Sequence, residues 1–509
     1  VSANSCCVFS PVSSNEVFNI IISLKNSSSR DVYGLSSDLI KKIASVIIEP
    51  LTYCFNRCIN DGVFPNSLKF SRVVPIFKKG NPDIPSSYRP ISCIPVIGKV
   101  LEKILKIQIC KYFESSGLFN DSQYGYRPGR STTHAIDGLI NQLLLTLESK
   151  NAAQVTLCDL SKAFDTVNHV ILLSKLEYYG FYGKDLEILK SYLSERKQLV
   201  DHNGSLSEVL EFKLGVPQGS VLGPILFLVL INDLSNNLSC YSTIYADDTT
   251  LLSYHNDVDQ LKIISENTLL EATHWFETNG LFLNKEKTQH LLVTLKTEDL
   301  LDSLSTVKLL GVNIDSNLSW KTHIAYICKR LSRVIYLLAN LKNKVSPRYL
   351  RMAYFSFFES IIRYCLIVWG NGIGIQKVLI VQKKAIRIIT GSNPRDHCRP
   401  LFRQLNILTV VNLYIFDVLM VIKKNLHLYT QRNAIHSHNT RNQERIELPR
   451  LRLSKSMNYH KNMGIKLFNK LPVSWKNLNH RKFSERLHEW LVNNPLYNLE
   501  EYFIFNFNT

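Results

Sequence analysis

The sequence predicts an α+β fold, with strands and helices mixed in the first part of the chain and mainly helices in the last. Strand-like runs at 73–77 and 154–160 alternate with helical patterns up to about residue 320. Beyond residue 321 the pattern becomes helical and basic, as in 324–342. This order is typical of a mixed α+β region followed by a helical one.

The expected elements follow from apolar spacing and from turn residues. Leu39, Ile43, Val46 and Ile47 recur at helical spacing, so a helix is expected over 37–60. The strand at 73–77 should end in a turn at 78–83, because Gly80 and Pro82 lie there. Further expected elements are helices over 95–113, 221–234 and 259–278, a strand over 154–160 followed by a helix, and two strands within 241–253 joined at 246–248.

The net charge of +18 over 509 residues is distributed unevenly. Residues 321–509 hold 31 Lys and Arg against 9 Asp and Glu, a balance of +22, whereas residues 1–320 hold 29 against 33. Such asymmetry indicates a polyanion-binding region beside a region with another task. A merely solvated basic surface is the alternative. Membrane-surface binding is less favoured, because the basic residues form no polybasic cluster beside an amphipathic anchor.

Composition excludes several classes of protein. No apolar run approaches the ~20 residues that span a bilayer, and no signal pattern opens the chain, so we expect no membrane partner and a nuclear and cytoplasmic rather than secreted protein. The 11 cysteines are scattered without zinc-ligand spacing, which favours reduced thiols. The chain begins with Val1 and its first Met is Met352, so it is expected to be a piece of something longer.

Three carboxylates carry the strongest chemical signal. Asp247 and Asp248 are adjacent between two apolar runs, and a hairpin tip would lift both out of a sheet. Asp159 ends the strand expected at 154–160. Taken singly, the pair is more often an ordinary turn and Asp159 more often a helix cap. Together, one acid at a strand end and two on a hairpin can hold two divalent ions about 3.5–4 Å apart. Three Asp without His or Cys is ligand chemistry that suits Mg²⁺.

The order of these segments resembles the reverse transcriptases of non-LTR retrotransposons, most closely the jockey-like group. The resemblance covers nearly the whole chain, through motifs at compatible spacing. They are Phe64-Pro65 with 73–80 and Tyr88-Arg89-Pro90-Ile91-Ser92; 123–132; Asp159-Leu-Ser-Lys-Ala-Phe164-Asp165; Gly215-Val-Pro-Gln218-Gly219-Ser220; Tyr245-Ala246-Asp247-Asp248; 279–288; and Leu309-Leu310-Gly311-Val312.

The resemblance implies a right-hand polymerase fold, with fingers, palm, helical thumb and a helical basic C-terminal region. The boundaries it suggests are an N-terminal extension over 1–50, fingers over 51–150, palm over 151–320, a thumb-like region over 321–400 and a basic C-terminal region over 401–509.

By the same resemblance, Asp159, Asp247 and Asp248 are the catalytic acids, and they would hold two Mg²⁺ ions, with Mn²⁺ as an alternative metal. Asp248 would be the least essential ligand. Lys287 matches a lysine that could act as general acid for the departing pyrophosphate, although it could equally be a simple exposed charge.

The resemblance also assigns residues to the incoming dNTP. Lys78 and Arg89 match finger residues that embrace the triphosphate, since Arg offers a bidentate fork and Lys a point charge. Phe164 matches the bulky residue that excludes a ribose 2′-OH, although without the motif it would be read as a core aromatic. The other expected substrate-binding residues are Arg72, Gln218 and Gly219.

Nucleic-acid binding is expected of basic residues in the second finger motif and in the tail. Arg127 lies in that finger motif, where a structural role is the alternative. The tail residues expected to contact nucleic acid are Lys329, Arg330, Lys383, Lys384 and Arg387.

The function that the resemblance implies is RNA-directed DNA polymerisation, primed at the target. The partners are then template RNA, a DNA primer or nicked target DNA, and dNTPs. An endonuclease domain, usual in full-length elements, is missing from this chain. The alternatives are a catalytically silent remnant or adopted RNA-binding protein, and an intron-encoded maturase-like enzyme. An RNA-dependent RNA polymerase is disfavoured by Phe164.

Overall fold

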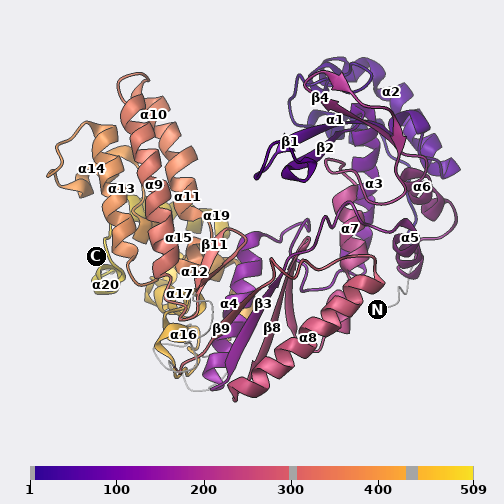
Figure 1. The fold of residues 1–509 in the computed structure, drawn as a ribbon. Coiled ribbons are helices and arrows are strands. Elements are labelled where there is room, and N and C mark those ends of the chain that lie inside the picture. Colours follow the sequence, from indigo (N-terminus) through magenta and orange to yellow (C-terminus); the bar gives the residue numbers. More distant parts are fainter. Residues whose placement is uncertain (1–5, 297–305, 431–444, 508–509) are drawn as a thin grey trace. The chain divides into compact units, whose positions relative to one another are not determined.

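The computed structural model describes residues 6–296, 306–430 and 445–507, and these fall into two compact units (Figure 1). Unit 1 contains residues 1–131, 156–252 and 265–288, and unit 2 contains 132–155, 253–264 and 289–509. The described chain mixes helices with strands up to Asp315, and helices prevail after that residue. The α+β class expected from the sequence is therefore confirmed.

Unit 1 combines a five-stranded sheet with helices. The helices are α1 (Ser14–Ile22), α2 (Ser37–Asp61), α3 (Val96–Ser115), α5 (His169–Tyr178), α6 (Gly183–Leu193) and α7 (Gly223–Ile231). The strands are β1 (Phe70–Phe77), β2 (Tyr88–Cys93), β4 (Lys197–His202), β5 (Ser205–Leu206), β6 (Leu210–Glu211) and β7 (Tyr241–Tyr245). Three further elements, β3 (Ala152–Cys158), β8 (Asp248–His255) and α8 (Val258–Thr278), contribute residues to both units.

Most elements expected in this part form close to their expected bounds. α2 begins after Ser36, whose side chain accepts a hydrogen bond from the N–H of Leu39, and ends at Gly62 in the left-handed conformation (φ +68°). The helix expected directly after 154–160 begins later, at His169, because residues 161–167 form turns. β4, β5 and β6 were not expected, since they are short and largely polar.

β1 organises the five-stranded sheet. It pairs antiparallel with β2, with Ile76 opposite Arg89, and parallel with β4, with Arg72 opposite Leu199. β5 and β6 both pair antiparallel with β4. The turn between β1 and β2 therefore brings Lys78 and Arg89 to one end of the sheet.

α7 is the centre of the core of unit 1. Every residue of this helix except Pro224 is buried, and the core gathers apolar side chains from α1, α2, α3, α5 and α6 around it. A helix that is apolar on all sides must be enclosed by other elements. The helix expected over 221–234 is thus confirmed over Gly223–Ile231.

A second sheet has the strand order β7-β8-β3-β9, where β9 is Gln289–Val293. β7 and β8 form an antiparallel hairpin in which Tyr245 pairs with Asp248. The two strands expected within 241–253 are thus confirmed, and their turn carries the adjacent acids.

Unit 2 is mainly helical. Besides α4 (Thr132–Glu148) and the hairpin of β10 (Thr306–Leu309) with β11 (Val312–Asp315), its longer helices include α9 (Lys321–Leu341) and α13 (Ile375–Thr390), which lie side by side (Figure 1). The remaining helices are α10 (Pro347–Ala353), α11 (Ser360–Arg363), α12 (Leu366–Trp369), α14 (Cys398–Leu405), α15 (Val410–Lys424), α16 (Ser454–Asn458), α17 (His460–Lys470), α18 (Val473–Lys476), α19 (His480–Asn493) and α20 (Leu499–Ile504).

Within the described ranges, no single helix has the length and apolar character needed to cross a bilayer. α14 and α15 meet that test only as a pair, with a bend of 51° between them.

Residues 452–461 of the C-terminal part bind to α4 near both of its ends. Near the start of the helix, the carboxylate of Asp137 accepts hydrogen bonds from the Tyr459 hydroxyl and from Nε2 of His460 (2.5 Å), and Lys461 Nζ lies 3.8 Å away. At its end, the Glu148 carboxylate accepts the N–H groups of Arg452 and Leu453, both at 2.9 Å. Residues more than 300 positions apart in the sequence therefore form one body.

The Asp137 network should make unit 2 acid-sensitive. Burial alone would raise the pKa of Asp137, but the hydrogen bonds and charges of His460, Lys461 and Tyr459 lower it to about 2. Because the folded pKa lies below the unfolded one, the stabilisation is fully present above about pH 4 and is lost as the pH falls toward 2. We predict that Asp137→Asn lowers the free energy of unfolding by about 2 kcal/mol at pH 7, measured with urea.

The difference between wild type and Asp137→Asn should narrow between about pH 4 and 2. Glu485→Gln, on the exposed face of α19, is the control and should match wild type. A difference that stays constant over this pH range would contradict the assigned network.

Candidate active site

The three acids singled out in the sequence come together in unit 1 at the ends of neighbouring strands. Asp159 directly follows β3, the turn between β7 and β8 carries Asp247, and Asp248 is the first residue of β8. Ala246, at the first position of that turn, has φ +59°, a left-handed conformation that non-glycine residues seldom adopt. The hairpin is thus tightly turned at the point that presents the acids.

Gln123 and Gly125 hold this turn in place. Residues 122–124 run parallel to β7: the N–H of Ile244 donates to the carbonyl of Ser122, and the N–H of Tyr124 donates to the carbonyl of Ile244 (both 2.8 Å). The side-chain oxygen of Gln123 accepts the N–H of Ala246 (3.2 Å). A Cβ at Gly125 would lie 2.4 Å from the Ala246 nitrogen, so only glycine fits there. Gln123 is therefore a positioning residue for the acids.

The acids perturb one another electrostatically. Burial raises the pKa of Asp247 and the charge of Asp159 raises it further, whereas Arg89 and Lys78 oppose the shift. Burial and the charges of Asp247 and Asp159 raise the pKa of Asp248 to about 6. Carboxylates that repel one another in this way favour a bound cation, because it removes the repulsion.

Lys287 supplies one cation at Asp159. Its Nζ lies 3.2 Å from Oδ2 of Asp159, and both side chains remain partly exposed (58% and 42%). The segment 282–288 runs beside 159–161, since the N–H of Ser161 donates to Phe282 and the N–H of Asn284 donates to Asp159 (both 2.8 Å). The backbone thus places Lys287 at the acid.

The oxygen donors suit a hard divalent cation, but they do not form a complete metal site. Within the described part of the chain, no three Asp, Glu, His or Cys side chains are grouped so that they could hold a metal ion. Mg²⁺ commonly takes only one or two carboxylates and completes its octahedron with water and substrate phosphates. The three acids therefore fit a site that is completed by a phosphate-bearing substrate.

Two of the three cations expected to bind the substrate act on the acids, and the third is engaged elsewhere. Lys78 and Arg89 are exposed and act on the charge of Asp247. Arg72 is held elsewhere, because its guanidinium lies 3.4 Å from Asp201 and donates to the carbonyl of Arg30 (2.9 Å). To bind substrate, Arg72 would have to give up these contacts.

The loop at 215–222 docks between β2 and the turn after β3. The carbonyl of Gln218 accepts the N–H of Ser92 (2.7 Å), and its side-chain amide donates to Asp165 (2.8 Å). A Cβ at Gly219 would lie 2.8 Å from the carbonyl oxygen of Ser92. Gln218 and Gly219 are thus fixed between β2 and the turn that contains Asp165.

Phe164 lies beside this loop, because its carbonyl accepts the N–H of Val216 (2.8 Å). Its ring stacks on Phe227 of α7 at 4.8 Å while the side chain stays half-buried. The residue therefore packs on the core and still keeps an accessible face.

Glu102 fixes the other end of the loop. This fully buried acid of α3 accepts the N–H groups of Val221 (2.6 Å) and Leu222 (3.1 Å) just before α7. Burial raises its pKa, while the positive charge of buried Arg196 and these N–H groups lower it. The positive end of the α7 dipole also stabilises a carboxylate in this position.

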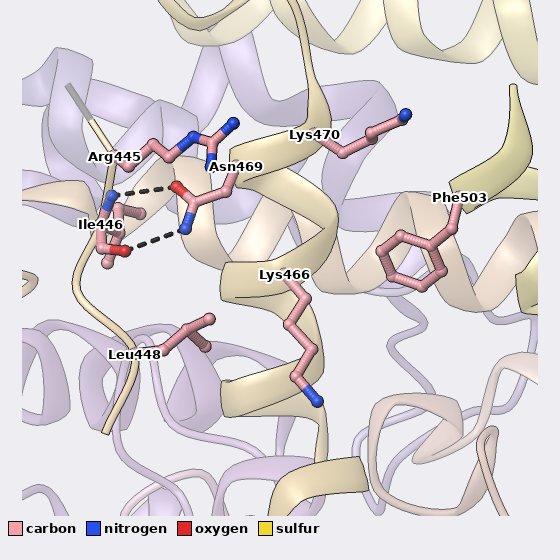
Figure 2. A pocket seen from close by; sticks show the side chains of 7 residues that line it. All are labelled: Arg445, Ile446, Leu448, Lys466, Asn469, Lys470 and Phe503. Atoms are coloured by element: carbon pink, nitrogen blue, oxygen red, sulfur yellow. Dashed lines mark hydrogen bonds between the residues drawn. The ribbon is translucent and has the colours of Figure 1, made fainter. Parts of the chain in front are cut away.

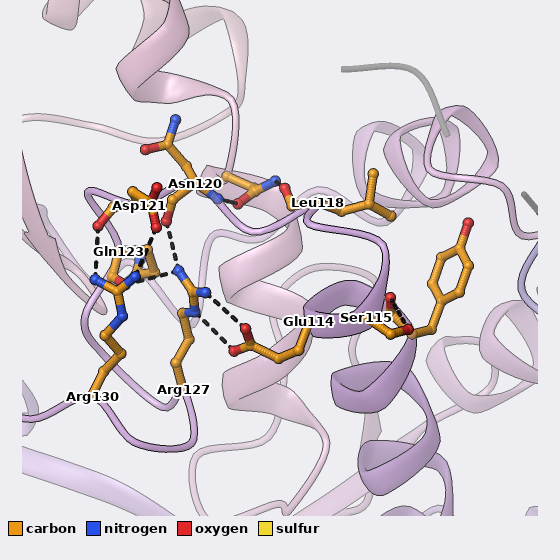
Figure 3. Close-up of polar contacts among 10 residues, drawn as sticks. Glu114, Ser115, Leu118, Asn120, Asp121, Gln123, Arg127 and Arg130 are labelled. Carbon is orange, nitrogen blue, oxygen red and sulfur yellow. Dashed lines mark hydrogen bonds and ion pairs between the residues drawn. The ribbon is translucent and has the colours of Figure 1, made fainter. Parts of the chain in front are cut away.

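Arg127 is engaged inside unit 1 (Figure 3). Its guanidinium forms a bidentate pair with Glu114 (3.0 and 2.8 Å) and donates to the carbonyl of Asn120, and its side chain is only 7% exposed. Arg130 pairs with Asp121 in the same loop. These contacts brace the loop that carries Gln123, which is the structural alternative the sequence left open for Arg127.

The predicted tail cations lie on two helices of unit 2 and differ in accessibility. Lys329 and Arg330 on α9, and Lys384 on α13, are exposed. Lys383 lies over the ring of Tyr497, with Nζ 3.5 Å from the centroid, and Arg387 donates to the carbonyl of Asp396 (2.8 Å). Lys383 and Arg387 are thus already engaged within unit 2, as is Arg330, which lies 5.8 Å from the ring centroid of Tyr326.

Comparison with known proteins agrees with this geometry. Residues 76–314 match the family model described as reverse transcriptase (RNA-dependent DNA polymerase). Residues 76–314 therefore form a reverse transcriptase domain, and the chain is similar to jockey-like reverse transcriptases.

Three relatives from Drosophila melanogaster illustrate the similarity. The probable RNA-directed DNA polymerase from transposon BS is 28% identical over 79% of this chain and 47% of its own length. That from transposon X-element is 26% identical over 87% and 49%, and the RNA-directed DNA polymerase from mobile element jockey is 27% identical over 78% and 46%. The chain spans about half the length of the curated relatives it matches.

Two residues that build this site were not singled out in the sequence. Glu102 lies on the buried stripe of α3 beside Leu101 and Leu105, and a lone acid on an apolar helix face was the available signal. Gln123 opens one of the quoted motifs, but its contact with Ala246 is 123 residues away in sequence. Nothing local could reveal it.

Glu102 offers a test of how the 215–222 loop is held. Glu102→Ala leaves two N–H groups without an acceptor and removes the countercharge of Arg196, so we predict a loss of about 2–4 kcal/mol in the free energy of unfolding. Hydrogen exchange at the amides of Val221 and Leu222 should accelerate. Glu102→Gln can still accept both bonds and should protect these amides better than alanine.

Glu177→Ala, at an exposed position of α5 in the same unit, is the control for Glu102. Unfolding free energies of Glu102→Ala and this control that agree within about 0.5 kcal/mol would overturn the role assigned to Glu102.

Proposed function

We propose that the chain is the polymerase part of a retrotransposon protein and copies the element RNA into DNA, starting from a 3′ end at the target. The observation that carries the proposal is the group of three acids, faced by finger cations, within a domain of the reverse transcriptase family.

A right-hand organisation accompanies this proposal. Fingers would comprise residues 51–150, after an extension over 1–50, and the palm 151–320. A thumb-like region over 321–400 and a basic region over 401–509 would follow. The β1–β2 turn, with its exposed cations, and the acid-bearing hairpin support the first two assignments. The helical, basic character of α9 and α13 supports the third.

Asp159 and Asp247 would hold the metal, with Asp248 as the weaker ligand. Reverse transcriptases generally use divalent metal ions, and we propose two Mg²⁺ ions here, replaceable by Mn²⁺. When bound, such ions activate the attacking 3′-hydroxyl and stabilise the leaving pyrophosphate oxygen. Lys287 pairs with Asp159 at 3.2 Å and would give up this contact when a metal ion binds the acid. Lys287 would then protonate the departing pyrophosphate.

The substrate would be oriented by residues of unit 1. Lys78 and Arg89 would bind the triphosphate, and Arg72 would join them after leaving Asp201. Gln218 and Gly219 would pack against the nascent base pair. The half-buried ring of Phe164, held by Phe227, would block a 2′-OH and select dNTPs.

The other partners would be template RNA and a DNA primer or nicked target DNA, in the nucleus or cytoplasm. The exposed cations of α9 and α13 support contact with these polyanions. The nick itself would come from an endonuclease that is not part of this sequence.

Asp247→Asn tests the catalytic acids by primer extension on an RNA template with dNTPs and Mg²⁺. We predict a fall in kcat of about a thousandfold or more, because a metal ion contributes several kcal/mol of transition-state stabilisation. Asp259→Asn, with a side chain that is 90% exposed, should leave kcat unchanged. Full activity of Asp247→Asn would refute the assignment.

Phe164 tests the choice of sugar. We predict that Phe164→Ala raises the ratio of rNTP to dNTP incorporation, measured as kcat/KM, by at least about tenfold, since a lost steric contact of this size is worth one to a few kcal/mol. Phe164→Leu keeps side-chain bulk over Phe227 and should change the ratio less. An unaltered ratio in both variants would show that Phe164 serves only the core.

A catalytically silent, RNA-binding remnant is the second candidate function. The exposed cations Lys329, Arg330 and Lys384 would bind RNA whether or not the three acids are catalytic. They therefore support an RNA-binding remnant as much as a polymerase. The two are separated by the wild-type chain itself: salt-dependent RNA binding without any nucleotide incorporation would select the remnant.

A further inference from the structure

A small basic pocket lies in the C-terminal part of unit 2 (Figure 2). It is a cavity of about 270 Å³ between the segment 445–448, α17 and α20. Its size is slightly below the usual range of small-ligand pockets, about 300–1,000 Å³. The space can therefore accept one compact group, and a nucleic-acid duplex cannot enter it.

The charge of the pocket is entirely positive. Among the described residues that line it, Arg445, Lys466 and Lys470 carry charge and none is a carboxylate. Within the described part of the chain, none of these three cations has an ion-pair partner, in contrast to Lys461, five residues before Lys466 on α17, which lies 3.8 Å from Asp137. Three neighbouring cations without an acid repel one another, and a phosphate would remove that repulsion.

The remaining wall is apolar and aromatic. Phe503 of α20 presents its ring between the two lysines, and Ile446 and Leu448 add aliphatic surface (Figure 2). The amide of Asn469 is consumed by two hydrogen bonds with the backbone of Ile446, each 2.9 Å, which fix this wall in place. Recognition is thus left to cations and to one ring face.

This combination selects the ligand class. Phosphates bind cations, and an unpaired base stacks on an aromatic ring in a manner that tolerates any sequence. An acidic peptide would use the cations but would have no use for the ring.

We propose that this pocket holds one unpaired nucleotide of single-stranded RNA, with its phosphates on Lys466, Lys470 and Arg445 and its base against Phe503. The choice of RNA rests on the proposed function, in which the element RNA is the template. The pocket would anchor that RNA to the C-terminal region, at a distance in sequence from the polymerase motifs.

The test measures the affinity of the whole chain for a fluorescent 20-nucleotide single-stranded RNA by anisotropy, over a series of salt concentrations. Lys466→Gln/Lys470→Gln should weaken binding at least tenfold and reduce the salt slope by about 1.4, or about 0.7 for each lost phosphate contact. Phe503→Leu keeps the side chain apolar but removes the stacking face, and should weaken binding about five- to a hundredfold with the slope unchanged.

The matched control is Arg450→Gln/Lys482→Gln, which removes the same charge at exposed positions that do not line the pocket. Equal loss in the control and in the lysine pair would mean that only net charge matters, and would overturn the pocket. So would unchanged RNA affinity in Phe503→Leu, or a loss restricted to duplex DNA.

A second readout separates this inference from the proposed function. Incorporation of dTTP on oligo(dT)-primed poly(rA), at RNA concentrations that saturate the variants, should remain within twofold of wild type in both pocket variants. If the wild-type chain incorporates nothing while the pocket variants still lose RNA affinity as predicted, the polymerase proposal fails and the pocket stands.

Discussion

The repulsion among Asp159, Asp247 and Asp248 is the constraint around which unit 1 is arranged. Burial, together with the charges of the neighbouring acids, raises the pKa of Asp247 and raises that of Asp248 to about 6. The backbone must hold them there against this repulsion. It does so with a left-handed residue at Ala246, an acceptor at Gln123 and a glycine at position 125. Lys287, Arg89 and Lys78 then reduce the excess negative charge.

Main-chain hydrogen bonds to several elements also fix the loop at 215–222. Gln218 is tied to Ser92 and to Asp165, and the loop continues into N–H groups that Glu102 accepts from inside the core. A buried acid without a salt-bridge partner within 4 Å is an unfavourable way to stabilise a fold. Its value here is positional, since an apolar residue at this site could not accept the N–H groups that precede α7.

The sequence indicated the residues of the site better than the contacts that orient them. Local spacing was enough to predict α2, α7 and the β7–β8 hairpin, and the motifs named the acids, because strand, turn and helix signals lie within a few residues of one another. The short polar strands β4 to β6 carried no such signal. The contacts that orient the acids, such as Gln123 with Ala246, join residues more than 100 positions apart, and their register depends on tertiary packing alone.

In the basic region, the net charge overstates the number of cations that are free of contacts within the chain. Lys383 covers Tyr497, Arg387 holds a carbonyl, Arg363 bridges Glu359 and Asp417, and Arg399 pairs with Glu501. These cations assemble unit 2. The C-terminal segment is likewise anchored on α4, inside the range that matches the polymerase family. Exposed cations such as Lys384 remain available to a polyanion, whereas the cations engaged inside unit 2 do not, so exposure is more informative than a count of basic residues.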